Sequence, residues 1–192
     1  DLLLAVDISG SMGAEDMQID DQLVNRLVAV KVALSEFIQR RPADRLGLIL
    51  FGSNAYIQTP LTFDHQSLNQ LLQEAQIGFA GDQTAIGDAI GLGIKRLTDT
   101  RHSGNSTETV NTTNNRVLIL LTDGANTAGQ VDPLEAAKMA AEQQIKIYTL
   151  GFGADEMLVR SLFGVRKVNP STDLDEASPC YASHRQGKRK EG

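Results

Sequence analysis

The sequence has 192 residues, of which 41% are hydrophobic, and this length and apolar content suit one domain with a sizeable core. Its 24 acidic and 18 basic residues give a net charge of −6, which argues against nucleic-acid binding as the main task. The single cysteine, Cys180, excludes an internal disulfide framework and a cysteine-rich zinc site. No apolar run reaches the roughly 18 residues of a membrane span, and no signal peptide is present. Because the chain starts directly on a core strand, we expect a domain excised from a longer protein.

The first predicted element is a strand at Leu2–Val6, a continuous apolar run of the kind that is buried on both faces of a parallel sheet. The segment D-I-S-G-S-M at 7–12 follows it, and then an acidic connection at 13–22, which we interpret as a solvated loop and helix start. Apolar residues that step by 4, 3, 4 and 3 then predict a long amphipathic helix from Leu23 through Phe37.

A tight turn separates the next two predicted strands, a buried one at Leu46–Phe51 and a short one at Ala55–Thr59. So short a connection favours an antiparallel pair, with the second strand at an edge of the sheet. The segments that follow alternate between helical and strand patterns. They are a short helix around Leu68–Leu72, a glycine-rich loop at 78–83, a helix at Ile86–Leu97, a polar loop at 99–115, a strand at Val117–Leu121, a helix at Pro133–Gln143, a strand at Ile145–Leu150 and a last helix at Asp155–Phe163.

Strands that alternate with helices predict an α/β fold, a doubly wound and mostly parallel sheet with helices on both faces and one antiparallel edge strand. We expect this domain to occupy residues 1–168 and residues 169–192 to form a poorly ordered or atypical tail, because apolar periodicity is lost there. Right-handed crossovers place the carboxyl ends of the parallel strands on one edge, where ligands of such sheets bind. Asp7 and Asp123 both follow apolar strands, so both belong to that edge, and Thr84 can reach it.

The segment after the first strand has the donor set of a half-built cation site. Asp7, Ser9 and Ser11 alternate along an extended chain, so their side chains can converge on one point, while Gly10 permits a sharp turn. One carboxylate with two hydroxyls suits Mg²⁺ better than Zn²⁺. The alternative is a polar turn whose serines cap the next helix, and this segment alone does not decide between the two.

Three phrases carry a family resemblance: D-I-S-G-S-M at 7–12, T-A-I-G-D-A-I at 84–90 and L-L-T-D-G at 120–124. They resemble the metal-ion-dependent adhesion site (MIDAS) of von Willebrand factor type A (VWA) domains, and the similarity implies the Rossmann-like VWA fold. Other phrases, such as L-I-L-F-G and Q-T-P-L-T-F-D, are similar to those of bacterial Bacteroides-aerotolerance (Bat) proteins. The chain departs from that group after Glu176, where A-S-P-C-Y-A replaces a helix of leucine, isoleucine and alanine.

The resemblance implies that Ser9, Ser11 and Thr84 ligate Mg²⁺ through their hydroxyls, with Mn²⁺ or Ca²⁺ as alternatives. Asp7 and Asp123 would act directly or through water. Because two carboxylates at most neutralise the dication, a partner's Asp or Glu could complete its coordination. The resemblance also implies a periplasmic domain of a bacterial inner-membrane protein that is anchored by transmembrane segments. Such a domain would work with other Bat-type proteins and a MoxR-type AAA+ ATPase.

An enzyme, such as a metal-dependent phosphohydrolase, is the main alternative. A phosphotransferase of the haloacid-dehalogenase type needs a second Asp where this chain has Ser9, and neither a P-loop nor a dinucleotide fingerprint occurs. His65, His102 and His184 are predicted to lie at the surface, so we expect no general base near the site and no enzymatic activity. Two further alternatives stay open, an adhesin-like binder of extracellular ligands and a scaffold with an empty pocket.

Overall fold

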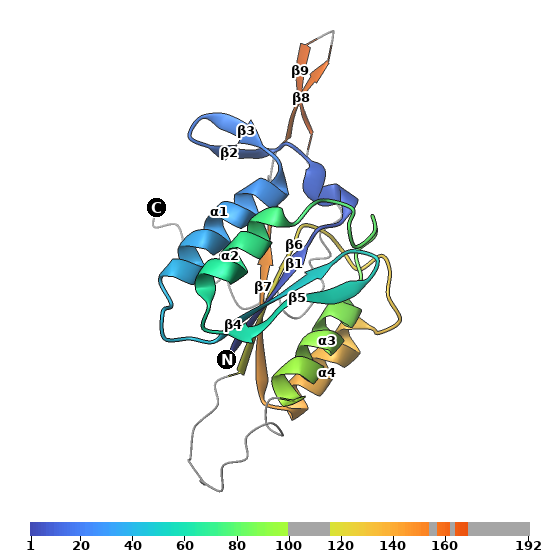
Figure 1. Ribbon diagram of the computed structural model, residues 1–192. Coiled ribbons are helices and arrows are strands. Elements are labelled where there is room, and N and C mark those ends of the chain that lie inside the picture. The colour runs from blue at the N-terminus through green and yellow to red at the C-terminus, as the bar shows by residue number, and fades with distance from the viewer. Residues whose placement is uncertain (100–115, 154–156, 162–163, 169–192) are drawn as a thin grey trace, which may run out of the picture.

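A five-stranded sheet forms the middle layer of the domain, with helices on both of its faces (Figure 1). The computed structural model describes residues 1–99, 116–153, 157–161 and 164–168. The strands of this sheet are β1 (Leu2–Asp7), β4 (Leu46–Phe51), β5 (Ala55–Thr62), β6 (Arg116–Thr122) and β7 (Ile145–Gly151). Their order is β5-β4-β1-β6-β7, and only the pair of β4 and β5 is antiparallel. The predicted mostly parallel sheet with one antiparallel edge strand is therefore confirmed.

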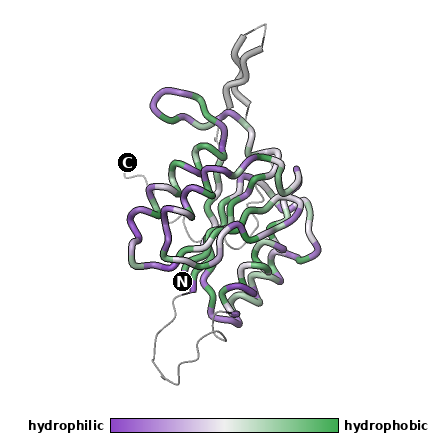
Figure 2. Tube along the Cα trace, viewed as in Figure 1, coloured by the Kyte–Doolittle hydropathy of each residue, from purple (hydrophilic) through white to green (hydrophobic). Residues whose placement is uncertain are grey.

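Two helices cover each face of the sheet. Among the described residues, the α-helices are α1 (Arg26–Gln39), α2 (His65–Glu74), α3 (Ile86–Asp99) and α4 (Pro133–Glu142), and a short 3₁₀ helix, η1 (Gly10–Gly13), follows β1. Side chains of β1 alternate between the two cores, because Leu4 and Val6 pack with residues of α1 and α2, while Leu3 and Ala5 pack with residues of α3 and α4. A strand that is buried on both faces reads as a continuous apolar run, and the hydropathy colouring shows such strands in the interior (Figure 2).

The first helix begins later than its apolar spacing predicts. The prediction that it starts at Leu23 is wrong, because Asn25 caps α1 and the helix begins at Arg26. The Asn25 side chain accepts a hydrogen bond from the Val28 amide at 2.8 Å, which satisfies one of the unpaired donors of the first turn. Leu23 matches the helical spacing by coincidence, since it is 69% exposed outside the helix.

The acidic connection before α1 leads into a β-hairpin, so its interpretation as a loop is wrong, although Glu15, Asp20 and Asp21 are exposed as expected. Strands β2 (Met17–Ile19) and β3 (Gln22–Val24) pair antiparallel. Asp20 and Asp21 form the two-residue turn between them, with φ angles of 47° and 62°. Aspartate tolerates this left-handed conformation better than most residues, and two such residues in succession match the twist of a hairpin.

The end of the described chain also differs from its prediction. Met157–Ser161, predicted as part of a helix, forms strand β8, which pairs antiparallel with β9 (Gly164–Val168). The short apolar run M-L-V in this segment cannot be assigned to a helix or a strand from periodicity alone. Most of the predicted polar loop and the whole predicted tail at 169–192 lie outside the described residues.

The strand order reverses at the carboxyl end of β1. From β1 the chain moves through α1 to β4 on one side, and later returns through α3 to β6 on the other side. The strand order therefore reverses at β1, and open α/β sheets bind ligands at such a point. Asp7 ends β1, and Asp123 directly follows β6.

Close packing of α3 yields a first prediction about stability. A Cβ atom on Gly87 would lie 1.8 Å from the backbone oxygen of Val131, whereas Gly91, one turn further along α3, faces open space. Gly87→Ala is expected to lower the free energy of unfolding by about 3 kcal/mol, because the loop before α4 must move. Gly91→Ala is expected to raise it by up to about 1 kcal/mol through helix propensity. Urea denaturation measures both, and equal effects would contradict the close contact.

Candidate metal centre

The five residues that the sequence singled out lie together at the carboxyl edge of the sheet. Thr84 Oγ1 donates a hydrogen bond to Ser9 Oγ at 3.2 Å, and Ser9 Oγ lies 3.1 Å from Ser11 Oγ. Ser11 Oγ in turn donates to Asp123 Oδ1 at 2.7 Å. Asp7 is connected to these hydroxyls through the backbone of Ser9, because Asp7 Oδ1 accepts a hydrogen bond from the Ser9 amide at 2.9 Å. Side chains from three separate segments therefore meet in one hydrogen-bonded group.

The spacing of these oxygens fits a small divalent cation. Neighbouring ligands of an octahedral Mg²⁺ ion at 2.0–2.1 Å are about 3 Å apart. Ser9 Oγ already lies 3.1 Å from Ser11 Oγ and 3.2 Å from Thr84 Oγ1, so small movements would let the three hydroxyls share an ion. Within the described ranges, no group of three His, Cys, Asp or Glu side chains could hold a metal by itself. An ion at this edge would therefore depend on hydroxyl ligands.

Burial makes the charge of Asp7 costly in the absence of a cation. Asp7 is fully buried, and desolvation raises the pKa of its carboxyl group above the ordinary value. Two hydrogen bonds to its carboxylate work against that shift, one from the Thr122 hydroxyl to Oδ2 at 2.6 Å and one from Ser9. Thr122 is a residue of the site that sequence reasoning missed, although it directly precedes Asp123 in the L-L-T-D-G phrase.

Backbone contacts from two neighbouring loops fix Thr84. The Thr84 amide donates to Thr127 Oγ1 at 3.0 Å, and the Thr127 amide donates to the Thr84 carbonyl at 2.9 Å. On the other side, the Ala85 amide donates to the Gly52 carbonyl at 2.8 Å. The loop after β6 and the turn after β4 therefore hold Thr84 against the end of β1.

A buried arginine that sequence reasoning also missed lies beside these residues. Arg26 Nη1 donates to Asp123 Oδ2 at 2.7 Å, and Arg26 Nε donates to both oxygens of Asp16 at 3.0 Å. The Arg26 and Asp16 side chains are only 9% and 1% exposed. The hydrogen bonds with Asp16 are the largest cause that raises the pKa of Arg26, so the guanidinium keeps its charge. The hairpin that brings Asp16 to Arg26 was not predicted, so the pair gave no signal in the sequence.

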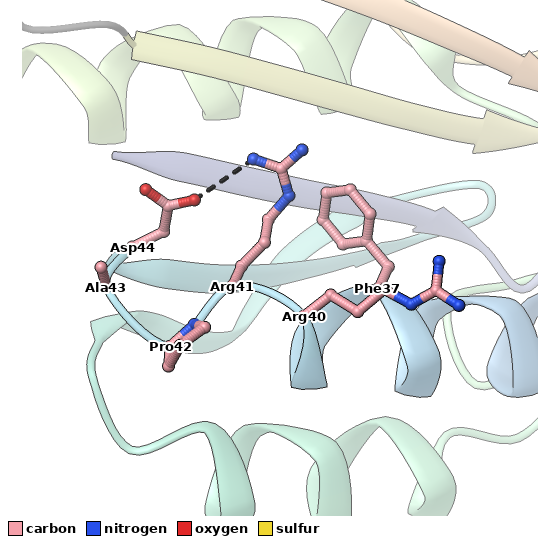
Figure 3. A pocket seen from close by; sticks show the side chains of 6 residues that line it. All are labelled: Phe37, Arg40, Arg41, Pro42, Ala43 and Asp44. Atoms are coloured by element: carbon pink, nitrogen blue, oxygen red, sulfur yellow. Dashed lines mark hydrogen bonds and ion pairs between the residues drawn. The ribbon is translucent and has the colours of Figure 1, made fainter.

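A pocket outlined by the structure lies away from this group, at the loop between α1 and β4. The Arg41 guanidinium lies 4.5 Å from the centre of the Phe37 ring, and Arg41 Nη1 donates to Asp44 Oδ2 at 3.2 Å. The lining residues are Phe37, Arg40, Arg41, Pro42, Ala43 and Asp44 (Figure 3). This loop precedes β4, so the pocket lies toward the amino edge of the sheet and includes none of the predicted ligands.

Comparison with known proteins identifies the family. The model of the von Willebrand factor type A domain matches residues 1–162. A protein of Borreliella burgdorferi, described only as uncharacterized, is 31% identical over 156 residues, which cover 81% of this chain and 41% of that protein. The chain spans less than half of the length of the two bacterial relatives that it matches, at 41% and 44%. Among the residues that the structure describes, no helix has the length and apolar content to cross a bilayer.

Solved structures agree with this family. An aerotolerance-related membrane protein from Bacteroides fragilis is 28% identical, with a TM-score of 0.69 over 93% of this chain and 83% of that chain. Proximal thread matrix protein 1 from the mussel byssus, solved with a zinc-occupied MIDAS motif, is 21% identical, with a TM-score of 0.56 over 80% of this chain and 35% of that chain. At that identity it shows the fold alone. The resemblance to Bat-type VWA proteins is thus confirmed, and the chain belongs to the von Willebrand factor type A domain family.

Proposed function

We propose that this domain binds a divalent cation, Mg²⁺ before Mn²⁺ or Ca²⁺, and uses it to capture an acidic side chain of a protein partner. The ligands would be Asp7, Ser9, Ser11, Thr84 and Asp123. The observation that carries the proposal is the chain of three hydroxyls that ends on Asp123. Ser9 and Thr84 are buried, whereas Ser11 is exposed, so the group opens to solvent on one side.

The donor set explains why the site would bind a partner. The bound metal would supply Lewis-acid attraction for an oxygen ligand from outside. The three hydroxyls hold a cation without neutralising it, and Arg26 already balances part of the charge of Asp123. The metal would therefore keep its Lewis-acid character toward an oxygen ligand at the open side, where a carboxylate could complete its coordination. VWA domains are generally interaction modules, and the proposal includes no catalytic step.

Exposed apolar side chains at the same edge suit a protein partner. Phe79 is 68% exposed on the loop between α2 and α3, and Leu23 is 69% exposed on β3. The β2–β3 hairpin extends from the same end of the domain as the carboxyl end of β1 (Figure 1). The Gly78 amide donates to the Ile8 carbonyl at 2.8 Å, so the loop that carries Phe79 is fixed beside the end of β1. Exposed aromatic and aliphatic side chains near a polar centre are typical of interaction surfaces. We infer a partner segment with an Asp or Glu flanked by apolar residues.

The cellular setting is part of the same proposal. The Bacteroides fragilis structure is described as that of a membrane protein, and the Bat-type resemblance covers most of this chain. We infer a domain on the periplasmic face of a bacterial inner-membrane protein, anchored by segments outside this chain. Other Bat-type proteins and a MoxR-type AAA+ ATPase are the partners that the resemblance favours.

A crosslinking pull-down from bacterial membranes tests partner capture. The native domain is expected to recover a partner in Mg²⁺, and the partner should be lost in EDTA and with Ser9→Ala, which removes the central hydroxyl of the site. Ser67→Ala is the matched control, because Ser67 lies exposed at the start of α2 and bonds only the cap residue Asp64 in the structure. A partner that binds Ser9→Ala in EDTA as well as it binds the native domain would overturn the proposal.

The hydroxyl of Thr122 is expected to support the metal through Asp7. Thr122→Val removes the hydrogen bond that orients the Asp7 carboxylate, at nearly constant volume. We expect Mn²⁺ binding to weaken about tenfold, as for other residues that orient metal ligands, and the free energy of unfolding to fall by about 1–2 kcal/mol. Calorimetric titration measures the affinity. Thr98→Val is the matched control, because the Thr98 hydroxyl donates only to the Ile94 carbonyl within α3. Its Mn²⁺ affinity should stay native. A similar loss of affinity in both variants would contradict the role of Thr122.

A further inference from the structure

A buried ion-pair triad connects the candidate metal centre to the base of the β2–β3 hairpin. Asp16 directly precedes β2, and Arg26 begins α1 just after β3. The Arg26 guanidinium lies between the carboxylates of Asp16 and Asp123 and donates to both. The Arg26 amide also donates to the Ala14 carbonyl at 3.2 Å, which fixes the start of the helix. A guanidinium remains charged at all ordinary pH values, so this is a permanent positive charge beside the site.

We propose that Arg26 is a positioning residue of the metal centre. It holds Oδ2 of Asp123, presents only Oδ1 of that carboxylate to the ion, and lowers the affinity of the site for the metal. This inference rests on the proposed function, because it concerns the same cation.

The hydrogen bonds of Asp123 carry the argument. Its Oδ1 accepts from Ser11 at 2.7 Å, inside the hydroxyl chain, and its Oδ2 accepts from Arg26 at 2.7 Å. An ion that bound both oxygens of Asp123 would have to displace the guanidinium. Arg26 cannot readily move away, because Asp16 holds its Nε through both carboxylate oxygens. Asp123 is thus limited to one oxygen on the side of the site.

The charges around the site, like the hydrogen bonds of Asp123, indicate that Arg26 lowers the affinity for the metal. Three carboxylates, those of Asp7, Asp16 and Asp123, share this region with one guanidinium, so the group carries a net charge of about −2. Removal of Arg26 would leave all three carboxylates uncompensated. A dication would then be attracted more strongly, and Asp123 could offer both oxygens to it. Removal of Asp16 would have the opposite effect, because the positive charge would stay while one negative charge was lost.

Mn²⁺ affinity in charge variants tests this role. Arg26→Met is expected to bind Mn²⁺ at least tenfold more tightly than the native domain, and Asp16→Asn several-fold more weakly. Water-proton relaxation should show fewer exchangeable waters on Mn²⁺ in Arg26→Met, since a second oxygen of Asp123 would replace one. Arg41→Met is the matched control, because it removes the same charge at the exposed pair with Asp44 and should leave affinity and hydration native. If Arg26 only stabilised the hairpin, both variants of the triad would weaken binding.

Two further comparisons keep the test decisive. If Arg26→Met alone fails to fold, the double variant Asp16→Asn, Arg26→Met removes both partners, and it should bind Mn²⁺ at least tenfold more tightly than Asp16→Asn alone. Native or weaker affinity in Arg26→Met, or weaker affinity in the double variant than in Asp16→Asn, would overturn the role of Arg26. Absence of Mn²⁺ binding to the native domain would instead overturn the proposed function.

Discussion

Mn²⁺ or Mg²⁺ at a thousand times its dissociation constant is expected to raise the free energy of unfolding of this domain by about 4 kcal/mol. The folded chain brings Ser9, Thr84 and Asp123 together from three segments, whereas the unfolded chain presents them far apart along the sequence. Binding to the folded state alone shifts the unfolding equilibrium by mass action. Urea unfolding with and without the metal measures the gain.

Ser9→Ala separates this effect from non-specific stabilisation by the salt. Ser9 lies in the middle of the hydroxyl chain, within 3.2 Å of both Ser11 Oγ and Thr84 Oγ1, and its loss changes no charge. We expect the gain from Mn²⁺ to disappear in Ser9→Ala and to stay at its native size in Ser67→Ala. A full gain in Ser9→Ala would show that the ion binds elsewhere.

The edge that holds Asp7 and Asp123 could be predicted because strong physical constraints act on it. A run such as Leu2–Val6 is apolar at every position, as a strand buried on both faces requires, and its alternation with helical segments favours a strand. Right-handed crossovers between parallel strands then bring the residue after each strand to the same edge. Asp7 ends β1 and Asp123 follows β6, and these strands are neighbours, so the topology places both residues at the same edge of the sheet.

The contributions of Arg26 and Asp16 could not be predicted, because they depend on tertiary contacts and not on periodicity. The apolar Leu23 fits the spacing of α1, but the cap at Asn25 decides where the helix begins, and the hairpin before it brings Asp16 back to Arg26. From the sequence, a charged residue near a predicted helix start is expected to be exposed to solvent. Burial of Arg26 becomes evident only when its two carboxylate partners are placed in space.

Asp7→Asn is expected to stabilise the metal-free domain at pH 7 and to remove the gain of about 4 kcal/mol from saturating metal. The Asp7 carboxyl is fully buried, and desolvation raises its pKa above the ordinary 3.8. Asparagine has the same shape and removes the charge that burial disfavours. Its amide oxygen can still accept the hydrogen bond from the Ser9 amide, and Thr122 can accept one from its amide nitrogen.

The raised pKa of Asp7 predicts how the difference in stability between the native domain and Asp7→Asn changes with pH. Because the pKa of Asp7 is raised in the folded state, the folded chain retains its proton while the unfolded chain ionises. The native domain therefore loses stability relative to Asp7→Asn as the pH rises from about 3.8 through the raised pKa, and the difference persists above it. Below 3.8 both chains carry a neutral side chain, so their stabilities should converge. Urea unfolding of the two metal-free proteins over a pH series measures the difference.

Asp64→Asn is the matched control, because its expected pH dependence has the opposite sign. Hydrogen bonds from Ser67 lower the pKa of Asp64, so the native carboxylate stabilises the domain above its unfolded pKa and loses that contribution on acidification. Asp64 lies exposed at the start of α2, so its replacement should leave the gain from metal intact. Asp7→Asn should raise the free energy of unfolding without metal and remove the gain from metal only if the buried carboxylate of Asp7 is a ligand of the cation. An Asp7→Asn domain that was less stable than the native one at pH 7, yet kept its full gain from Mn²⁺, would assign Asp7 a structural role alone.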